Sequence, residues 1–449
     1  MVKKLFLLCC FFTSLFAKEF FTQEKIQKYL NDTNPYYYSI KAHYYTNKQK
    51  EQITRANFDT KLHAKYENKS YPLSSASYTQ ASFIKPLYNG IELNVGYRDA
   101  EGTQEYNNIK TGKDGEIITS IKLPLVGIAT NRSRNAITYE LSKLQSKTSK
   151  AQTEVDVLAL YLQITQNYFQ LLYEHELLTL TQHLLNKAKE HLVFIQKEVL
   201  LGNRAKIELL DVQSQVIERE QKLLLLRNQL MQSKNNFIKF LNIPLKKFDD
   251  KYKLPNIKPF FKKLLSQQEY LALAKKQRQE FITIAYEKKK IKEHIKGIVF
   301  EQYPDMDVTF YGVHDLAYKK DGYKISANLV FPLERNSYKG KKQLYKREQL
   351  RFDALEAVLS NNIKTNIKNL LNAISLMKRQ IALANQETKL RKKLEKSENI
   401  KYKEGLSSLV LVNQRESATL LSQQKYLQAL LKIQIYYLQL MSEIGHYQL

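Results

Sequence analysis

Cysteine is nearly absent from this sequence of 449 residues, because its only two, Cys9 and Cys10, stand side by side near the start. The opening MVKKLFLLCCFFTSLFA has a basic beginning, an apolar core and a small residue at Ala17, which is the pattern of a secretory signal peptide over residues 1–17. The cysteines lack the small residues that precede a lipidated cysteine, so we expect no lipid anchor. The mature chain then has no cysteine, which excludes disulfides and thiol chemistry.

Long apolar runs and enzyme motifs are also missing. Beyond the opening stretch no continuous apolar run reaches about 18 residues, so we expect no transmembrane helix. The motifs HExxH, CxxC, GxSxG and GxxxxGK[ST] do not occur. His175, His183 and His191 recur every eight residues, and successive side chains rotate by about 80° on a helix, so they predict no metal site. We expect no enzyme, no cofactor and no bound metal.

Acidic residues are scarce relative to basic ones, with 44 Asp and Glu against 71 Lys and Arg, a net charge of +27. A basic balance is typical of proteins that bind nucleic acid or anionic membrane surfaces. A signal peptide argues against nucleic acid as the main partner. The lysines are spread through helical patterns such as YEKKKIKEHIK and KLRKKLEK, which favours solvated helix faces.

Proline and glycine are missing from two long regions, apart from one glycine in each. Gly202 is the only such residue between Gly127 and Pro244, and Gly405 the only one between Gly340 and Gly445. Glycine adopts the left-handed conformation that ends a helix without steric cost. Each region therefore predicts two antiparallel helices joined by a glycine turn, with a kinked continuous helix as the alternative. The predicted helices cover residues 129–201, 203–244, 341–404 and 406–444.

The two halves of the sequence resemble each other. TQEKIQKYLNDTNPYYYSI, beginning at Thr22, aligns with SQQEYLALAKKQRQEFITI, beginning at Ser266, and VLLGNRAKIELL aligns with YKEGLSSLVLV. Ser266 and Glu269 fit a capping box at the start of a helix. We predict a first repeat at 18–244, a linker at 245–265 and a second repeat at 266–449. Each repeat would contain an opening helix, strands, a proline, a long helix, a glycine turn and a medium helix.

Short segments of alternating apolar and polar residues predict strands in both repeats. Apolar residues on one face and polar ones on the other are what a membrane β-barrel requires, while a sheet packed on a helical core is the soluble alternative. So few strands cannot close a barrel alone, and lipid does not tolerate an open sheet edge. The chain must therefore oligomerise if the strands lie in a membrane. The clearest segments are 90–98, 115–123, 305–312 and 322–331, with further candidates at 58–67 and 77–87.

The duplicated plan, FPLERNSYKG before a long helix, the YKEG turn and the terminal IYYLQLMSEIG resemble the outer-membrane efflux protein (TolC-like) family. The resemblance covers nearly all of the mature chain. It implies a mainly α fold with membrane β-strands: a trimeric TolC-like α-barrel plus β-barrel, with two internal structural repeats per chain. It also implies that the protein is an outer-membrane exit duct of a tripartite efflux or type I secretion system, with a long periplasmic extension. The implied partners are a homotrimer, a periplasmic adaptor, an inner-membrane pump and outer-membrane lipid, but no nucleic acid.

The same resemblance suggests two kinds of functional residue. The glycine turns become tips that dock on the adaptor, and a tyrosine near the second tip can bond an acid on the neighbouring tip and hold the aperture closed. The tip residues are Leu201, Gly202, Asn203, Glu404, Gly405 and Leu406, and the latch residues are Tyr402, Glu208 and, one turn further, Asp211.

Two departures from the family pattern change these expectations. Leu411 and Gln414 stand where some members carry paired acids, so an acidic constriction is not expected. The family has four barrel strands per protomer, whereas this sequence offers six candidates. The competing interpretation is a secreted basic coiled-coil protein with a structural or adhesive role. It explains the charge and the helices, but not strands placed symmetrically in two repeats.

Overall fold

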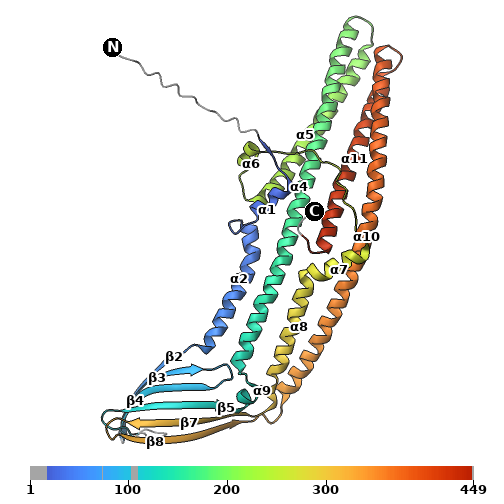
Figure 1. Ribbon diagram of the computed structural model, residues 1–449. Helices are drawn as coiled ribbons and strands as arrows, with labels where there is room; N and C mark the ends of the chain where they lie inside the picture. The colour runs from blue at the N-terminus through green and yellow to red at the C-terminus, as the bar shows by residue number, and fades with distance from the viewer. Residues whose placement is uncertain (1–17, 73, 103–109, 447–449) are drawn as a thin grey trace, which may run out of the picture. The chain divides into compact units, whose positions relative to one another are not determined.

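The computed structural model describes residues 18–72, 74–102 and 110–446 (Figure 1), so the predicted signal peptide at 1–17 lies outside the described residues. The chain divides into two compact units. Unit 1 comprises Met1–Ile40, Asp156–Arg278 and Asn362–Leu449, and unit 2 comprises Lys41–Val155 and Gln279–Asn361. Each unit contains residues from both predicted repeats.

Unit 1 contains two helical hairpins, although the first parts of the long helices α4 and α10 belong to unit 2. Helix α4 (Arg134–Leu200) is followed by α5 (Lys206–Leu241), and α10 (Asn336–Lys403) by α11 (Leu409–Glu443). The glycine turns and the helices predicted on either side of them are thus confirmed, with ends shifted by a few residues. Within the described ranges, no helix is both long and apolar enough to cross a membrane. The shorter elements are β1 (Glu19–Phe20), η1 (Gln23–Lys25), α1 (Ile26–Tyr29), α6 (Leu245–Lys251), β6 (Tyr252–Lys253) and α7 (Gln267–Gln277).

An aromatic cluster ties the first described residues to this helical frame. Phe21 is fully buried, and its ring meets Phe237 of α5 at 5.4 Å and Tyr252 at 5.0 Å, edge to face in both cases. The Tyr168 hydroxyl of α4 donates a 2.6 Å hydrogen bond to the Phe21 carbonyl. Strand β1 also pairs in parallel with β6. The aromatic rings therefore fix the first described residues against α4, α5 and the segment after α5.

The opening helix of each repeat is divided, which corrects the prediction of a single helix. In the first repeat α1 ends before Asn34, and α2 (Pro35–Arg55) begins at the next residue. Proline favours the first helical position, and the Asn34 side-chain oxygen accepts from the Tyr36 amide at 3.0 Å. In the second repeat the break falls at Arg278, between α7 and α8 (Gln279–Gly297). The alignment that begins at Thr22 and Ser266 places the two breaks at matching positions.

The predicted capping box is confirmed at the start of α7. The Glu269 amide donates to the Ser266 hydroxyl oxygen at 3.3 Å, and the Ser266 amide donates to the Glu269 carboxylate at 2.7 Å. These two bonds satisfy amides that the first turn of a helix leaves without partners.

Unit 2 contains a six-stranded antiparallel sheet in the order β2-β3-β4-β5-β7-β8 (Figure 1). Each of the six segments proposed from alternation overlaps one strand of this sheet, so the sheet has six strands in the described residues and not four. Strand β5 of the first repeat pairs with β7 of the second, which joins the repeats in one sheet. The strands are β2 (Lys61–Tyr71), β3 (Ser74–Pro86), β4 (Glu92–Gly102), β5 (Glu116–Pro124), β7 (Asp305–Asp315) and β8 (Lys320–Val330). The unit also holds η2 (Ala56–Phe58), α3 (Leu125–Thr130) and α9 (Val299–Gln302).

The register separates an apolar face of the sheet from a polar one. Phe83 lies opposite Val95, and Ile121 lies opposite Phe310, which in turn lies opposite Ile325. All five of these side chains are exposed to solvent in the single chain. The alternating positions carry Asn94, Ser120, Lys324 and similar polar residues on the other face. The sheet thus has the apolar surface that contact with lipid demands.

Candidate functional site

The two glycine turns have the same backbone geometry. Gly202 has φ +78° and Gly405 φ +76°, so both adopt the left-handed conformation. The Asn203 amide donates to the Glu198 carbonyl at 2.9 Å, and the Leu406 amide donates to the Lys401 carbonyl at 2.8 Å. The Gly202 amide also donates to the Val199 carbonyl, and the Gly405 amide donates to the Tyr402 carbonyl. Each turn therefore forms a Schellman motif. A Cβ at either glycine would meet nothing within 4 Å, so only the backbone conformation requires glycine.

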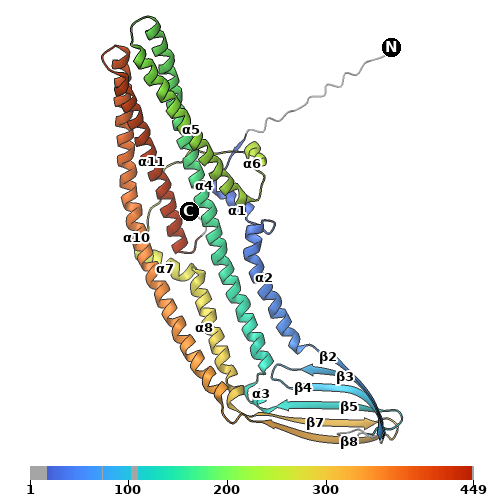
Figure 2. The same ribbon diagram turned by 180° about the vertical axis from the view of Figure 1, so that it is seen from behind.

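Both tips present leucine to solvent. Leu201 is 71% exposed and Leu406 is 74% exposed, while Gly202, Asn203, Glu404 and Gly405 are exposed as well. Figures 1 and 2 show the two turns at the same end of the unit 1 helices. The structure therefore brings all six predicted tip residues to one end of unit 1.

A buried cluster beneath the tips joins the two hairpins. Tyr402 of α10 packs with Ile195 of α4, Val212 of α5 and Leu409 and Val412 of α11, and each of these side chains is at most 5% exposed. All the long helices of unit 1 contribute to this contact. The aromatic ring of Tyr402 thus helps to hold the tips together through packing.

The polar surroundings of Tyr402 were not expected from the sequence. The guanidinium of Arg204 lies 4.8 Å from the ring centre, and Arg204 also donates to the Glu208 carboxylate at 3.3 Å. Within the described residues of one chain the Tyr402 hydroxyl is buried and has no hydrogen-bond partner, so it bonds neither Glu208 nor Asp211. Burial raises the pKa of Tyr402, and the nearby Arg204 charge opposes that rise. The latch between neighbouring tips stays a prediction.

A buried ionic triad lies further along the same helices. The Glu416 carboxylate of α11 has no exposed surface and accepts from Arg219 of α5 at 2.9 Å and from His191 of α4 at 3.2 Å. Arg219 also donates to the Leu184 carbonyl of α4 at 2.9 Å. Burial alone would raise the pKa of Glu416, but the bonds from His191 and Arg219 lower it below the ordinary range. The triad thus fixes α11 against both helices of the other hairpin.

Sequence reasoning missed this triad, although a signal was present. Val212, Arg219 and Leu226 are seven residues apart, as are Leu409 and Glu416, and the apolar members of both series are buried. A charged residue in a core register indicates a buried pair. From the sequence, His191 was considered only as a metal ligand, together with His175 and His183. Among the described residues no group of three His, Cys, Asp or Glu side chains is arranged to hold a metal ion.

Exposed apolar residues form a regular stripe on the outer side of each hairpin. Leu210, Ile217, Leu224 and Met231 follow one another at seven-residue spacing on α5, and between 49% and 62% of each residue is exposed. On α10 the corresponding stripe is Leu376, Leu383 and Leu390, which are 61–65% exposed. A seven-residue repeat of apolar residues is the pattern by which one helix packs on another.

The stripes lie on α5 and α10, which also contact the other hairpin through Arg219 and Tyr402. The bonds from His191 to Glu416 and from Gln428 to the Tyr173 hydroxyl, the latter at 3.3 Å, both connect α4 with α11. Figures 1 and 2 show α11 between α4 and α10. Helices α5 and α10 therefore form the two outer sides of the arrangement, and each has an apolar stripe without a partner in the described chain.

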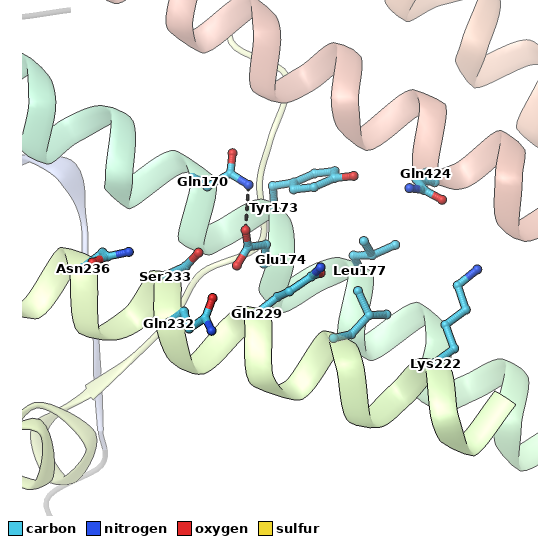
Figure 3. Close-up of a pocket in the computed structure, with 11 residues that line it drawn as sticks. Gln170, Tyr173, Glu174, Leu177, Lys222, Gln229, Gln232, Ser233, Asn236 and Gln424 are labelled. Carbon is cyan, nitrogen blue, oxygen red and sulfur yellow. Dashed lines mark hydrogen bonds between the residues drawn. The ribbon is translucent and has the colours of Figure 1, made fainter. Parts of the chain in front are cut away.

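A polar groove of about 460 Å³ runs between α4 and α5 (Figure 3). Gln170 donates to the Glu174 carboxylate at 2.7 Å on its wall, and Gln229, Gln232 and Asn236 of α5 line the other side. Tyr173, Lys222 and Ser233 add further polar groups to the lining, which can hydrogen-bond water or a hydrated solute.

The comparisons with known proteins agree with this geometry. Residues 93–242 match the model of the family described as outer membrane efflux protein, a family of transport channels and not of enzymes. No sequence relative is found among the curated proteins.

Solved structures with the same fold include membrane proteins of several bacteria. VceC, the outer membrane protein of Vibrio cholerae, superposes with a TM-score of 0.69 at 12% identity, covering 95% of this chain and 97% of that one. The open-state outer membrane channel MtrE of Neisseria gonorrhoeae gives 0.69 at 14% identity, with 94% and 88% covered. A membrane protein from Pseudomonas aeruginosa gives 0.72 at 12% identity, with 96% and 91% covered. The family match is confined to residues 93–242, while over nearly its whole length the chain has the fold of these solved outer-membrane proteins.

Proposed function

We propose that three copies of this chain form an outer-membrane exit duct of a tripartite efflux system. The duct receives substrates from an inner-membrane pump through a periplasmic adaptor and releases them outside the cell. The observation that carries the proposal is the pair of unpartnered apolar stripes on opposite outer helices, Leu210 to Met231 on α5 and Leu376 to Leu390 on α10.

Two different stripes on one chain favour a closed ring. A contact between unlike surfaces repeats from copy to copy, and it ends only when the rotation returns to the first copy. The α5 stripe of one copy would pack on the α10 stripe of the next, and the ring of hairpins would enclose the duct. Exposed leucines in water are costly, at about 25 cal/mol per Å² of apolar surface, so burying both stripes favours assembly.

The sheet supplies a second reason for a ring. Within the described residues β2 and β8 each pair on one side only, so the sheet has two open edges. A sheet in lipid cannot leave its edge amides and carbonyls without partners. Pairing with strands of the neighbouring copies would close the sheet in the outer membrane, while the helical hairpins would extend into the periplasm.

The adaptor would bind at the glycine tips. Leu201 and Leu406 offer apolar side chains at the ends of both hairpins, and the Schellman turns hold them in fixed positions. A helical hairpin of the adaptor fits between such tips. The triad of Glu416, Arg219 and His191 keeps the two tips of one copy in register beneath that contact.

The competing role, a secreted coiled-coil protein, leaves the sheet unexplained. In a protein surrounded by water, a sheet face on which Val95, Phe310 and Ile325 are all exposed would be unfavourable.

Deletion of the gene tests the proposal. Cells that lack the protein should retain more of a fluorescent dye exported by their pumps, and the restored gene should return dye retention to normal. The protein should sediment with the Sarkosyl-insoluble outer membrane and should change its mobility on heating in detergent. Recovery of the chain as filaments in the culture medium, with unchanged dye export, would contradict the proposal.

A further inference from the structure

We propose that the β2–β3 hairpin is part of the membrane barrel, so that the trimer is closed by eighteen strands and the hairpin sets a wide exit. This inference rests on the proposed function, because the ring of three copies supplies the other strands. Strands β4, β5, β7 and β8 alone would give a ring of twelve. The family pattern of four strands per chain predicts the ring of twelve.

The pairing of the hairpin with the rest of the sheet is continuous. Strand β3 pairs with β4 from Ala76 opposite Gly102 to Pro86 opposite Glu92, which is the full length of β4. Strand β2 pairs with β3 along its whole length, from Lys61 to Tyr71. Figure 1 shows β2 and β3 lying beside β4 in the same sheet. A flap that only touched the sheet would pair over part of its length.

One row of the apolar face extends onto the hairpin, while the next rows pair Ala64 with Ala81 and Tyr66 with Thr79. Leu62 lies opposite Phe83, which lies opposite Val95, so an apolar row crosses from β2 to β4. Leu62 and Tyr66 are 64% and 69% exposed in the single chain, as much as Ile325 on β8 at 59%. Lipid around the hairpin accounts for this apolar row, whereas a hairpin in water would have no reason to present it.

The polar face is equally continuous. A groove of about 1060 Å³ on that face takes side chains from every strand between β2 and β8. Its lining carries charges of both signs and many hydrogen-bonding groups, as expected of a wall facing a water-filled channel. Examples are Lys65, Gln80, Arg98, Ser120, Tyr311 and Lys324.

Because both six and four are even numbers of antiparallel strands, the ring can close with or without the hairpin. Six antiparallel strands place β8 antiparallel to the β2 of the next copy, and β2 and β8 both have 11 residues. Four strands would likewise place β8 antiparallel to β4 of the next copy. An antiparallel barrel can therefore gain or lose the hairpin without breaking its closure.

The consequence is a wider exit. With strands about 4.8 Å apart and tilted by about 40°, eighteen strands give a backbone diameter of about 36 Å, against about 24 Å for twelve. Barrels of 16–18 strands leave an open aqueous channel. The exit would then admit bulky hydrated solutes, and the periplasmic tips would control passage.

Cysteine cross-linking tests which strand meets β8, because the mature chain has no other cysteine. Ser326→Cys on the polar face of β8 is combined in turn with His63→Cys, Lys65→Cys or Glu67→Cys on β2, and the purified trimer is oxidised. The matched set combines Ser326→Cys with Asn94→Cys or Arg98→Cys on β4. We expect disulfide-linked dimers and trimers with at least one β2 position and with no β4 position.

The outcomes separate this inference from the proposed function. A trimer in which β4 positions cross-link and β2 positions do not overturns the eighteen-stranded ring but leaves the duct intact. A trimer in which no β2 position cross-links also overturns it. A protein that stays monomeric in native mass measurement overturns both proposals.

Removal of the hairpin supplies the readout on function. A chain in which residues 61–90 are replaced by a short linker should still form trimers. Polymers of graded size added from the strand side of planar bilayers should then be excluded at a diameter about one third smaller. An unchanged exclusion size would show that the hairpin lies outside the barrel, and would overturn the inference.

Discussion

At the scale of single residues, Tyr402 is where packing and polarity compete. Its ring lies in the cluster that joins the hairpins, while its hydroxyl is buried without a partner in one chain. Glu208, its predicted partner, is already bonded to Arg204 in the same chain. Sequence resemblance identified Tyr402 and Glu208, but the position of Arg204 between them depends on how the two tips pack. An unpaired buried hydroxyl is costly, so a partner on the neighbouring copy would stabilise the closed tip.

Tyr402→Phe measures that bond, because it keeps the ring and removes the hydroxyl. A charge-assisted bond at a wet duct mouth contributes at most about 1.5–3 kcal/mol. If it forms three times in the trimer, its loss should raise single-channel conductance in planar bilayers. Glu208→Gln should act in the same direction, and the double variant should add little.

Tyr402→Ala is the control for packing. It removes a fully buried ring, which should cost about 3–5 kcal/mol and make the tips leak whether or not the latch exists. If Tyr402→Phe conducts like the natural protein while Tyr402→Ala leaks, then only packing matters and the latch is wrong.

Glu416→Gln should destabilise the helical unit at neutral pH. It keeps the shape of the side chain but leaves the buried Arg219 without its counter-charge, which typically costs about 3–5 kcal/mol. The pKa of Glu416 is lowered in the folded protein, so its contribution is present above the ordinary carboxyl pKa and is lost as pH falls through the folded value. Melting of helical circular dichroism should therefore differ most between variant and natural protein near pH 7, and the difference should shrink in acid.

Glu404→Gln is the matched control, because Glu404 is an exposed carboxylate at the second tip. It should leave the melting temperature nearly unchanged at every pH. Equal melting of Glu416→Gln and the natural protein at pH 7 would show that the triad does not stabilise the contact between the hairpins.

At the scale of elements, the sequence predicted the long helices because their breakers are so few. Gly202 and Gly405 marked both turns, and both have positive φ. Asn131 and Asn242 also end helices in the left-handed conformation, with φ of 52° and 55°, but asparagine is common enough elsewhere to give no such signal. In the sequence, Asn34 and Pro35 indicate where the first opening helix is divided. Its counterpart at Arg278 carries no local signal.

The strands show a different limit of sequence reasoning. Alternation located all six, but it did not reveal which strands are neighbours. The pairing of β5 with β7 connects Glu116–Pro124 with Asp307–Asp315, almost two hundred residues away. Such a pairing is decided by the register of whole strands.

Valine at the glycine tips should abolish export. A β-branched residue is strained at positive φ, so Gly202→Val or Gly405→Val would distort a Schellman turn and displace the leucine beside it. Outer-membrane insertion should be unaffected, since the strands lie in the other unit. Dye retention in cells that carry each variant, together with the amount of protein in the outer membrane, checks this.

Asparagine at the same positions is the control. Asn131 and Asn242 already adopt the left-handed conformation in this chain, so Gly202→Asn and Gly405→Asn should export almost normally. Normal export by both valine variants would argue against docking through the tips.

At the scale of the whole molecule, the apolar stripes are the reason to propose that the chain assembles with copies of itself. The leucines of α5 and α10 are visible in the sequence, but only the structure separates exposed Leu224 from buried Leu223 and Leu226. The structure likewise shows that basic side chains of α10 lie at the surface. Those exposed are Lys389, Lys392, Lys393 and Lys396. Those lysines are consistent with a solvated face, while the stripe beside them requires a partner.

A charge placed in one stripe should dissociate the trimer. Leu383→Glu would bury a carboxylate in the contact between copies, which is costly without a partner. Ala382→Glu is the control, because Ala382 is exposed and lies seven residues before the exposed Lys389, on the solvated face. Native mass measurement in detergent should show smaller species for Leu383→Glu and unchanged trimers for Ala382→Glu. Equal oligomeric state in both variants would mean that α10 does not form the contact.

The most direct test of the duct is the partner of Leu224 in intact cells. A photo-reactive amino acid at position 224 should yield covalent species of two and three chains on irradiation. Mass spectrometry should then place the cross-link on residues 376–390 of a second copy. Irradiation that yields only single chains, or cross-links from position 224 to α5 of another copy, would contradict the ring of unlike contacts on which the proposed function depends.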